Sequence, residues 1–203
     1  MSLLYPIVIM RFGLLRKKIT KRHLRKIVIF TSLFIGLSIN ISFGQKFRSE
    51  KGLISFFSDG AIEDILAENY AAGSLFDGST GEMVFIVPIL EFRFPKSLMR
   101  EHFNEKYMET EKYPKSTFQG KISGFNLNSS GEQKVKAVGK LTMHGVTKEV
   151  SVPGTVEFVN GKAIVKARFI IRLQDYNIKI PTLVWQNIAE EVELKVDFIY
   201  KTL

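Results

Sequence analysis

The second half of the chain alternates apolar and polar residues with a period of two. The clearest run ends the chain, where every second residue from Val192 to Tyr200 is apolar and most of the residues between them are charged. The same alternation runs over residues 135–143, 150–158 and 163–173. Because successive side chains of a β-strand point to opposite faces, each run predicts a strand with one apolar face.

Short turns separate these runs. Asn160-Gly161 is typical of a tight hairpin, because both residues tolerate a positive φ. His144-Gly145 joins the preceding pair of strands, and His144 is expected to cap that turn. Thr142, Thr147 and Lys148 flank it, and cross-strand pairing and turn closure explain them best.

The first half is less regular. Strands are predicted at residues 53–57, 70–76 and 83–94, whereas 61–67 fits either a helical turn or a strand. The 83–94 run is apolar on both faces, which predicts a strand covered on both sides. Residues 97–105 (SLMREHFNE) predict a short helix with Ser97 as its N-cap and with one face formed by Leu98, Met99, His102 and Phe103.

These elements predict an all-β fold. No helix-length segment separates the later strands, which argues against parallel strands joined by crossover helices. About eight antiparallel strands with one short helical crossover form either a closed barrel or a sandwich. An eight-stranded barrel is wide enough to hold one small ligand.

The first 44 residues predict an export signal. A basic stretch at residues 16–26 precedes an apolar run at 27–41, and small residues in Ser42-Phe43-Gly44 place cleavage before Gln45. The apolar run has about 15 residues, fewer than the ~20 of a membrane span, although an uncleaved anchor stays the alternative. A start at Met10 instead of Met1 would give a signal of more ordinary length. We therefore expect a signal peptide at 1–44, a barrel domain at 45–203, and a periplasmic or secreted protein without a stable membrane span.

The charge and the absence of cysteine narrow the functions further. Eight of the 29 Lys and Arg residues lie in the expected signal, so residues 45–203 carry 21 basic against 20 acidic residues. A near-neutral domain lacks the basic surface of a nucleic-acid-binding protein. The chain has no cysteine, which excludes disulfides, a thiol nucleophile and a cysteine lipid anchor. Export without disulfides suits a bacterial periplasm.

Two sequence blocks resemble a known family. Residues 139–153 (GKLTMHGVTKEVSVP) are similar to the characteristic hairpin of the YceI-like family of exported barrel proteins. Residues 98–120 resemble the preceding part of the same family, with "EHFNE" at 101–105 and "KYPKSTFQG" at 112–120. The resemblance implies an extended, lipocalin-like barrel, in which some members enclose a long isoprenoid tail. It extends over residues 83–203, and the crossover at 91–102 departs from the usual family pattern.

Few residues suggest catalysis. His102 lies between Glu101 and Glu105 and could be a metal ligand or a general base, but the favoured interpretation is a structural histidine that supports the crossover and bonds to the backbone. No nucleophile elbow of an α/β-hydrolase is present. Trp185 either lines the barrel mouth or plugs the barrel end. We expect no enzymatic activity, no cofactor and no metal.

The apolar strand faces carry the functional prediction. The chain is predicted to bind or carry a hydrophobic small molecule or lipid, of the polyisoprenoid type that the resemblance implies. A filled barrel acting as a stress-related or interaction protein is the alternative, an enzyme using His102 is a third, and a homodimer stays open. Alternation predicts the barrel lining as Phe85, Phe118, Ile122, Leu141, Val156, Phe169, Ile171, Leu194, Val196 and Phe198.

Overall fold

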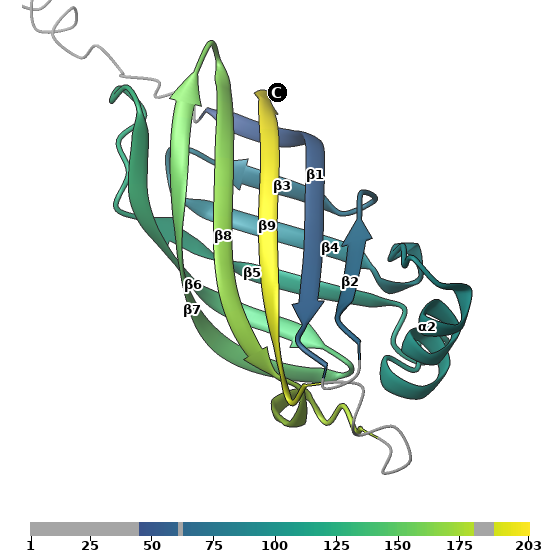
Figure 1. Cartoon of the computed structure of the whole chain (residues 1–203). Helices are drawn as coiled ribbons and strands as arrows, with labels where there is room; N and C mark the ends of the chain where they lie inside the picture. The colour runs from purple at the N-terminus through teal and green to yellow at the C-terminus, as the bar shows by residue number, and fades with distance from the viewer. Residues whose placement is uncertain (1–44, 61–62, 181–188) are drawn as a thin grey trace, which may run out of the picture. The chain divides into compact units, whose positions relative to one another are not determined.

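The computed structural model describes residues 45–60, 63–180 and 189–203. Within these ranges, nine strands form one antiparallel sheet (Figure 1). A crossover with a 3-10 turn, a short helix and a π-helical turn connects the fourth strand to the fifth. The elements are β1 (Lys46–Ser58), β2 (Ile65–Asn69), β3 (Gly73–Asp77), β4 (Glu82–Pro88), η1 (Ile89–Glu91), α2 (Ser97–His102), η2 (Phe103–Tyr107), β5 (Lys115–Ser123), β6 (Glu132–Met143), β7 (Val146–Val159), β8 (Lys162–Arg172), η3 (Leu173–Tyr176) and β9 (Glu191–Thr202).

Strand β1 closes the sheet into a barrel. It pairs with β9 from Phe47 to Phe57, and its first residues, Lys46–Arg48, pair with β3 on the other edge. Farther along the same edge, Ile54–Ser58 pair with β2 instead. The predicted eight-stranded antiparallel barrel with a short helical crossover is therefore confirmed, and β2 is an added strand beside one half of β1.

The alternating second half forms the strands that the pattern predicts. β6 to β9 pair antiparallel in sequence order, and β6–β7 and β7–β8 are hairpins. Both predicted turns adopt positive φ, with 49° and 75° at His144-Gly145 and 51° and 72° at Asn160-Gly161. Thr142 and Thr147 are paired across the first hairpin, and their hydroxyls lie 2.8 Å apart.

In the first half of the chain, the observed strands differ from the predicted ones at three places. The short strand expected at 53–57 is part of the longer β1, which a register shift between Ser49 and Lys51 interrupts. The stretch 61–67 contains the start of β2, and the strand expected at 70–76 begins only at Gly73. The prediction that 83–94 is one strand covered on both faces is wrong, because β4 ends at Pro88 and its outward Ile86 is 50% exposed.

The crossover helix has the expected place but a different start. α2 begins at Ser97, and Lys96 is its N-cap, without a side-chain capping bond. The prediction that Ser97 caps the helix is therefore wrong, since Ser97 is the first helical residue. α2 continues directly into the π-helical turn η2, and only Phe103 of the predicted apolar face reaches a cluster of aromatic rings.

The barrel interior is filled in one half. Phe47 and Phe76 stack with ring centroids 5.6 Å apart, and Phe76 also packs against Phe158 and Tyr200. Tyr200 is fully buried, and its hydroxyl donates a 2.7 Å hydrogen bond to Ser74. This packed half lies toward the end of the barrel that carries the C-terminus (Figure 1).

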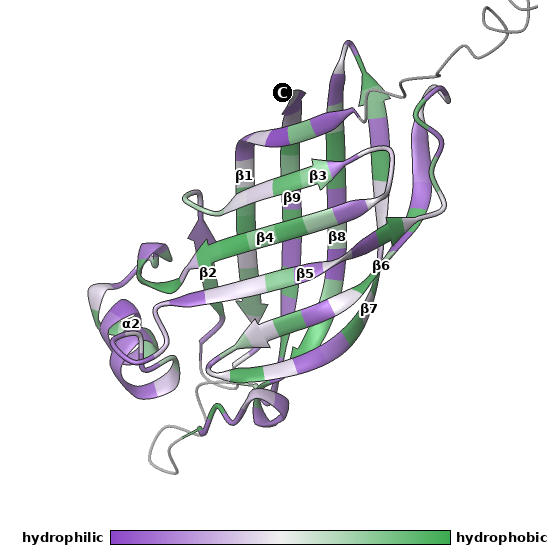
Figure 2. Cartoon of the chain, turned by 180° about the vertical axis from the view of Figure 1, so that it is seen from behind, coloured by the Kyte–Doolittle hydropathy of each residue, from purple (hydrophilic) through white to green (hydrophobic). Residues whose placement is uncertain are grey.

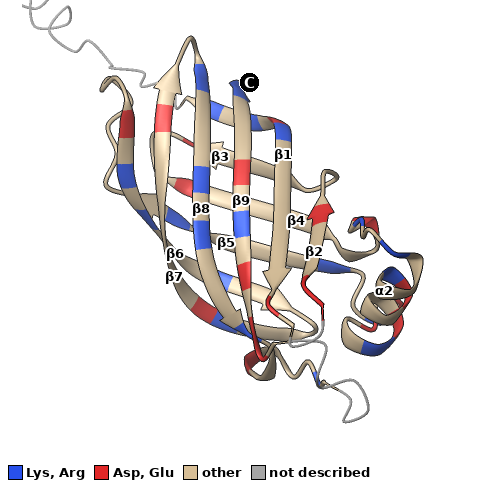
Figure 3. Ribbon diagram, viewed as in Figure 1, with Lys and Arg blue, Asp and Glu red and all other residues tan. Residues whose placement is uncertain are grey.

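The outer surface carries both signs of charge. In Figure 3, the charged positions of β8 are all Lys or Arg, whereas acidic and basic positions are interspersed along β9. Several of them pair across strands, as Arg172 does with Glu191 at 2.8 Å and Lys162 with Glu50 at 2.6 Å. Exposed pairs of this kind contribute about 0–1 kcal/mol each. Within the described ranges, no helix is both long and apolar enough to cross a bilayer.

Candidate ligand-binding cavity

The other half of the barrel is hollow. It contains a cavity of about 450 Å³, which falls within the range of roughly 300–1,000 Å³ for small-molecule pockets. Its walls come from every strand except β3 and from the crossover, and Figure 2 shows the apolar bands along β4 and β6 that contribute to them. The strand residues of the wall include Ile54, Phe56, Ile65, Phe85, Val87, Phe118, Ala137, Leu141, Met143, Val150, Val152, Ala167, Phe169, Ile171, Val192, Leu194 and Val196.

Aromatic rings form the floor of the cavity toward the packed half. Phe85 lies on the cavity wall and meets Phe198 edge to face, with centroids 4.9 Å apart and planes at 88°. Phe198 is fully buried and lies over Gly52, its cross-strand partner on β1. A Cβ at Gly52 would lie 2.3 Å from the Phe198 ring, so the missing side chain of Gly52 makes room for the floor.

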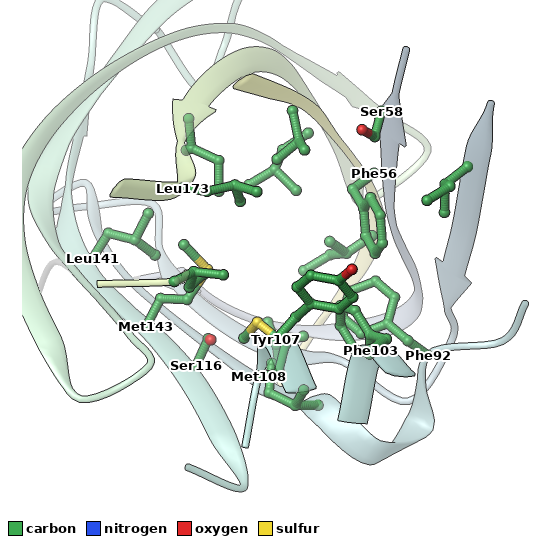
Figure 4. A pocket seen from close by; sticks show the side chains of 18 of the residues that line it. Phe56, Ser58, Phe92, Phe103, Tyr107, Met108, Ser116, Leu141, Met143 and Leu173 are labelled. Carbon is green, nitrogen blue, oxygen red and sulfur yellow. The ribbon is translucent and has the colours of Figure 1, made fainter. Parts of the chain in front are cut away.

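A second aromatic cluster builds the wall beside α2. Phe56 of β1 packs against Phe92, Phe94 and Phe103 of the crossover, with centroids 5.4–5.9 Å apart. Figure 4 shows Phe56, Phe92 and Phe103 on the same side of the cavity. Along this part of β1, the neighbouring strand is β2 and not β3. Here the crossover, and not a further strand, supplies the wall of the cavity. The sequence prediction did not assign these residues to the cavity, because Phe92, Phe94 and Phe103 lie in the crossover and Phe56 lies on a strand without clear alternation.

The cavity contains few polar groups. The Ser58 hydroxyl oxygen accepts a 3.0 Å hydrogen bond from the Ala189 amide. Lys96 and Glu63 form a 2.5 Å ion pair whose side chains are about half exposed. Tyr107 points its hydroxyl into the cavity, and burial raises the pKa of this phenol (Figure 4). Ser116 is the remaining buried hydroxyl of the wall.

The predicted barrel lining divides between the two halves. Seven of the ten predicted residues lie on the cavity wall, namely Phe85, Phe118, Leu141, Phe169, Ile171, Leu194 and Val196. The structure places Ile122, Val156 and Phe198 in the core instead, with at most 2% of each side chain exposed. All three are buried as the alternation predicts, but neighbouring side chains fill the space around them. Trp185, the predicted mouth or plug residue, lies outside the described residues.

The two histidines of the described residues have different surroundings. His102 of α2 is partly buried and lines the cavity. His144 is buried at the β6–β7 turn, where its Nδ1 lies 3.0 Å from the Tyr176 carbonyl oxygen and its Nε2 lies 2.9 Å from a Glu109 carboxylate oxygen. His144 thus connects its hairpin to η3 and to the end of the crossover. In the described part of the chain, no three His, Asp or Glu side chains are grouped to hold a metal ion.

A family comparison decides what kind of barrel this is. The family model described as the YceI-like domain matches residues 50–200. The chain belongs to the YceI-like family. The resemblance of the two sequence blocks is thereby confirmed, and the YceI-like match also includes most of β1 and all of β2 and β3, where the motifs were weak.

Solved structures share this fold at low sequence identity. BcnA of Burkholderia cenocepacia is 18% identical, with a TM-score of 0.63 over 73% of this chain and 95% of its own. A polyisoprenoid binding domain from Saccharophagus degradans, implicated in plant cell wall breakdown, is 14% identical, with a TM-score of 0.67 over 77% and 98%. A YceI protein of Campylobacter jejuni is 16% identical, with a TM-score of 0.54 over 68% and 84%. No curated protein matches this YceI-like sequence.

Proposed function

We propose that this YceI-like protein is exported and holds one apolar amphiphile with an isoprenoid-type tail in its cavity, without chemical conversion. The observation that carries the proposal is the cavity of about 450 Å³ in a barrel whose other half is packed. Its walls are aliphatic and aromatic, and its charged groups, Lys96 and Glu63, are paired with each other. An apolar chain fits such surroundings, because it needs no polar partner.

The energy of burial is sufficient for binding. Each buried CH₂ contributes about 0.8 kcal/mol, so a five-carbon isoprene unit contributes roughly 3–4 kcal/mol before ordering costs. Three or four units would reach about micromolar affinity with few polar contacts. The Saccharophagus degradans domain, described as polyisoprenoid-binding, supports the same ligand class for this fold.

The packed half favours one competing function. Its stacked rings, among them Phe47, Phe76 and Phe158, are what a filled barrel without a ligand would contain. In that case the protein would act through its outer surface, as a stress-related or interaction protein. The two functions differ in whether the hollow half takes up an apolar molecule.

Native mass spectrometry of detergent-free protein tests the proposal. We expect a copurifying lipid that organic solvent extracts, and uptake of the apolar dye N-phenyl-1-naphthylamine by the extracted protein. Ala167→Trp should block both, because Ala167 faces the cavity and an indole there fills it. Lys166→Trp is the matched control, since the neighbouring Lys166 is exposed on the outer face. A protein that carries no lipid and takes up no dye contradicts the proposal and supports the filled barrel.

Export and the absence of catalysis need their own tests. N-terminal sequencing of the protein recovered from the periplasm should give Gln45 as the first residue, whereas a full-length chain in the membrane fraction would indicate an anchor. If an activity is detected, His102→Ala should leave it unchanged. Loss of that activity in the variant would instead support the enzyme hypothesis.

A further inference from the structure

Among the inward-facing serines of the described residues, Ser116 is the one whose hydroxyl has no hydrogen-bond partner. It lies on β5 opposite Val87 of β4, and only 6% of it is exposed. Its Oγ is the one buried side-chain nitrogen or oxygen atom that has no hydrogen-bond partner within the described residues. Ser116 also lines the cavity, and Figure 4 shows its hydroxyl at the cavity wall.

Other inward serines of the barrel do have partners. The Ser74 hydroxyl donates to the Val84 carbonyl at 2.8 Å and accepts from Tyr200, and Ser58 accepts from the Ala189 amide. A buried hydroxyl without a partner destabilises a folded protein, and this is why most buried hydroxyls are bonded. Ser116 therefore has unused hydrogen-bonding capacity that faces the cavity.

The surroundings of Ser116 are apolar. Val87 is its cross-strand partner, and Met108 and Met143 also line the cavity (Figure 4). Phe118, the next residue on the same face of β5, lies about 7 Å farther toward the floor. A hydrogen-bonding group that reaches Ser116 must therefore belong to a molecule inside the barrel.

We propose that Ser116 forms a hydrogen bond to an uncharged oxygen of the bound amphiphile, so that the ligand is a neutral alcohol, ether or carbonyl compound. The inference depends on the proposed function and specifies its ligand class. The oxygen is uncharged because a buried phosphate or carboxylate needs a cation, and the lysine of the wall, Lys96, already pairs with Glu63. The Tyr107 hydroxyl, which points into the same cavity, offers a second polar contact.

Three probes with the same fifteen-carbon skeleton test this ligand class. Farnesol ends in a hydroxyl, farnesyl methyl ether ends in a methoxy group, and farnesene has a fourth double bond and no oxygen. Each displaces N-phenyl-1-naphthylamine from the extracted protein if the cavity binds isoprenoid chains. We expect Ser116→Ala to weaken farnesol and the ether by about threefold to tenfold, the equivalent of one neutral hydrogen bond, and to leave farnesene unchanged. Because the comparison is made between proteins for each probe, differences in probe solubility cancel.

Ser123→Ala is the control, since Ser123 lies on the same strand but is exposed. It should change none of the three affinities. If Ser116→Ala affects farnesol and farnesene equally, or affects neither, the hydrogen bond to the ligand is refuted. If no probe displaces the dye from the wild-type protein, the binding function itself fails, which is a different outcome.

Discussion

Removing the ring of Phe85 should deepen the cavity. Phe85 forms the floor together with Phe198, and it also packs against Phe118 with centroids 6.3 Å apart. It is 8% exposed and has the cavity on one side and the packed half on the other. Phe85→Ala removes about six carbon atoms, which is close to the size of one isoprene unit.

The substitution has opposite effects on stability and on binding. Truncating a buried phenylalanine costs about 3–5 kcal/mol of unfolding free energy. A ligand tail longer by one isoprene unit can fill the new space and bury about five further carbons, which contribute roughly 4 kcal/mol before ordering costs. With about 2 kcal/mol lost to ordering the longer tail, the net gain is about 2 kcal/mol, or about 30-fold in affinity.

Dye displacement by geraniol, farnesol and geranylgeraniol measures this effect. In the wild-type protein, affinity should rise with chain length until the tail reaches Phe85, and then level off. In Phe85→Ala the rise should continue for about one further isoprene unit. If Phe85→Ala folds too poorly to be measured, Phe85→Leu, which removes less volume, is used for the same comparison.

Phe158→Ala is the matched control, because Phe158 lies in the packed half and does not line the cavity. It should lower stability without changing the dependence of affinity on chain length. If the ratio of variant to wild-type affinity for Phe85→Ala is the same for all three alcohols, Phe85 does not limit the tail length, and the description of the floor is wrong.

Three further predictions concern stability. Gly52→Ala should lower the urea midpoint by the equivalent of about 1–3 kcal/mol, because its Cβ would lie 2.3 Å from the Phe198 ring; a midpoint equal to the wild type would contradict the close approach. His144→Ala should cost about 2–3 kcal/mol, because it removes a buried side chain and leaves the carbonyl of buried Tyr176 unpaired. Lys148→Ala, at a half-exposed ion pair with Asp175, should cost less than about 1 kcal/mol, and equal losses would count against this ranking. Burial raises the pKa of Tyr200, although its bond to Ser74 lowers it, so stability that is full below about pH 10 should decline above it. Tyr200→Phe should weaken that decline, and an unchanged slope in alkaline urea titrations would contradict the assignment.

The sequence predicts the barrel best where adjacent strands are joined by tight turns. Between Glu132 and Thr202 every strand has a one-sided apolar pattern, and two of the turns have residues suited to positive φ. β1 was harder to predict, because the register shift after Ser49 breaks its period. The 83–94 run misled the prediction because its apolar residues serve two structures, the inner face of β4 and the wall of the crossover.

The position of the cavity could not be read from the same alternation. Leu194, Val196 and Phe198 share the inner face of β9, yet the first two line the cavity and the third closes it. The difference depends on what lies opposite each residue, and for Phe198 that is Phe85 and the side-chain-free Gly52. Such contacts join residues far apart in sequence, so a pattern within one strand contains no information about them. The unpartnered hydroxyl of Ser116 was missed for the same reason.

The two halves of the barrel are closed by different means, and this explains where ligand preference should be encoded. At the packed end, β1 completes the barrel by pairing directly with β3 through Lys46–Arg48. At the hollow end, β1 pairs with β2, and the crossover is joined to β2 through the bridge between Glu68 and Arg93. One wall of the cavity is therefore a segment without strand periodicity, which can change its shape without disturbing the ladder of the barrel. This segment includes residues 91–102, where the sequence departs from the usual YceI-like pattern. The same residues contribute directly to the surface that a ligand would contact.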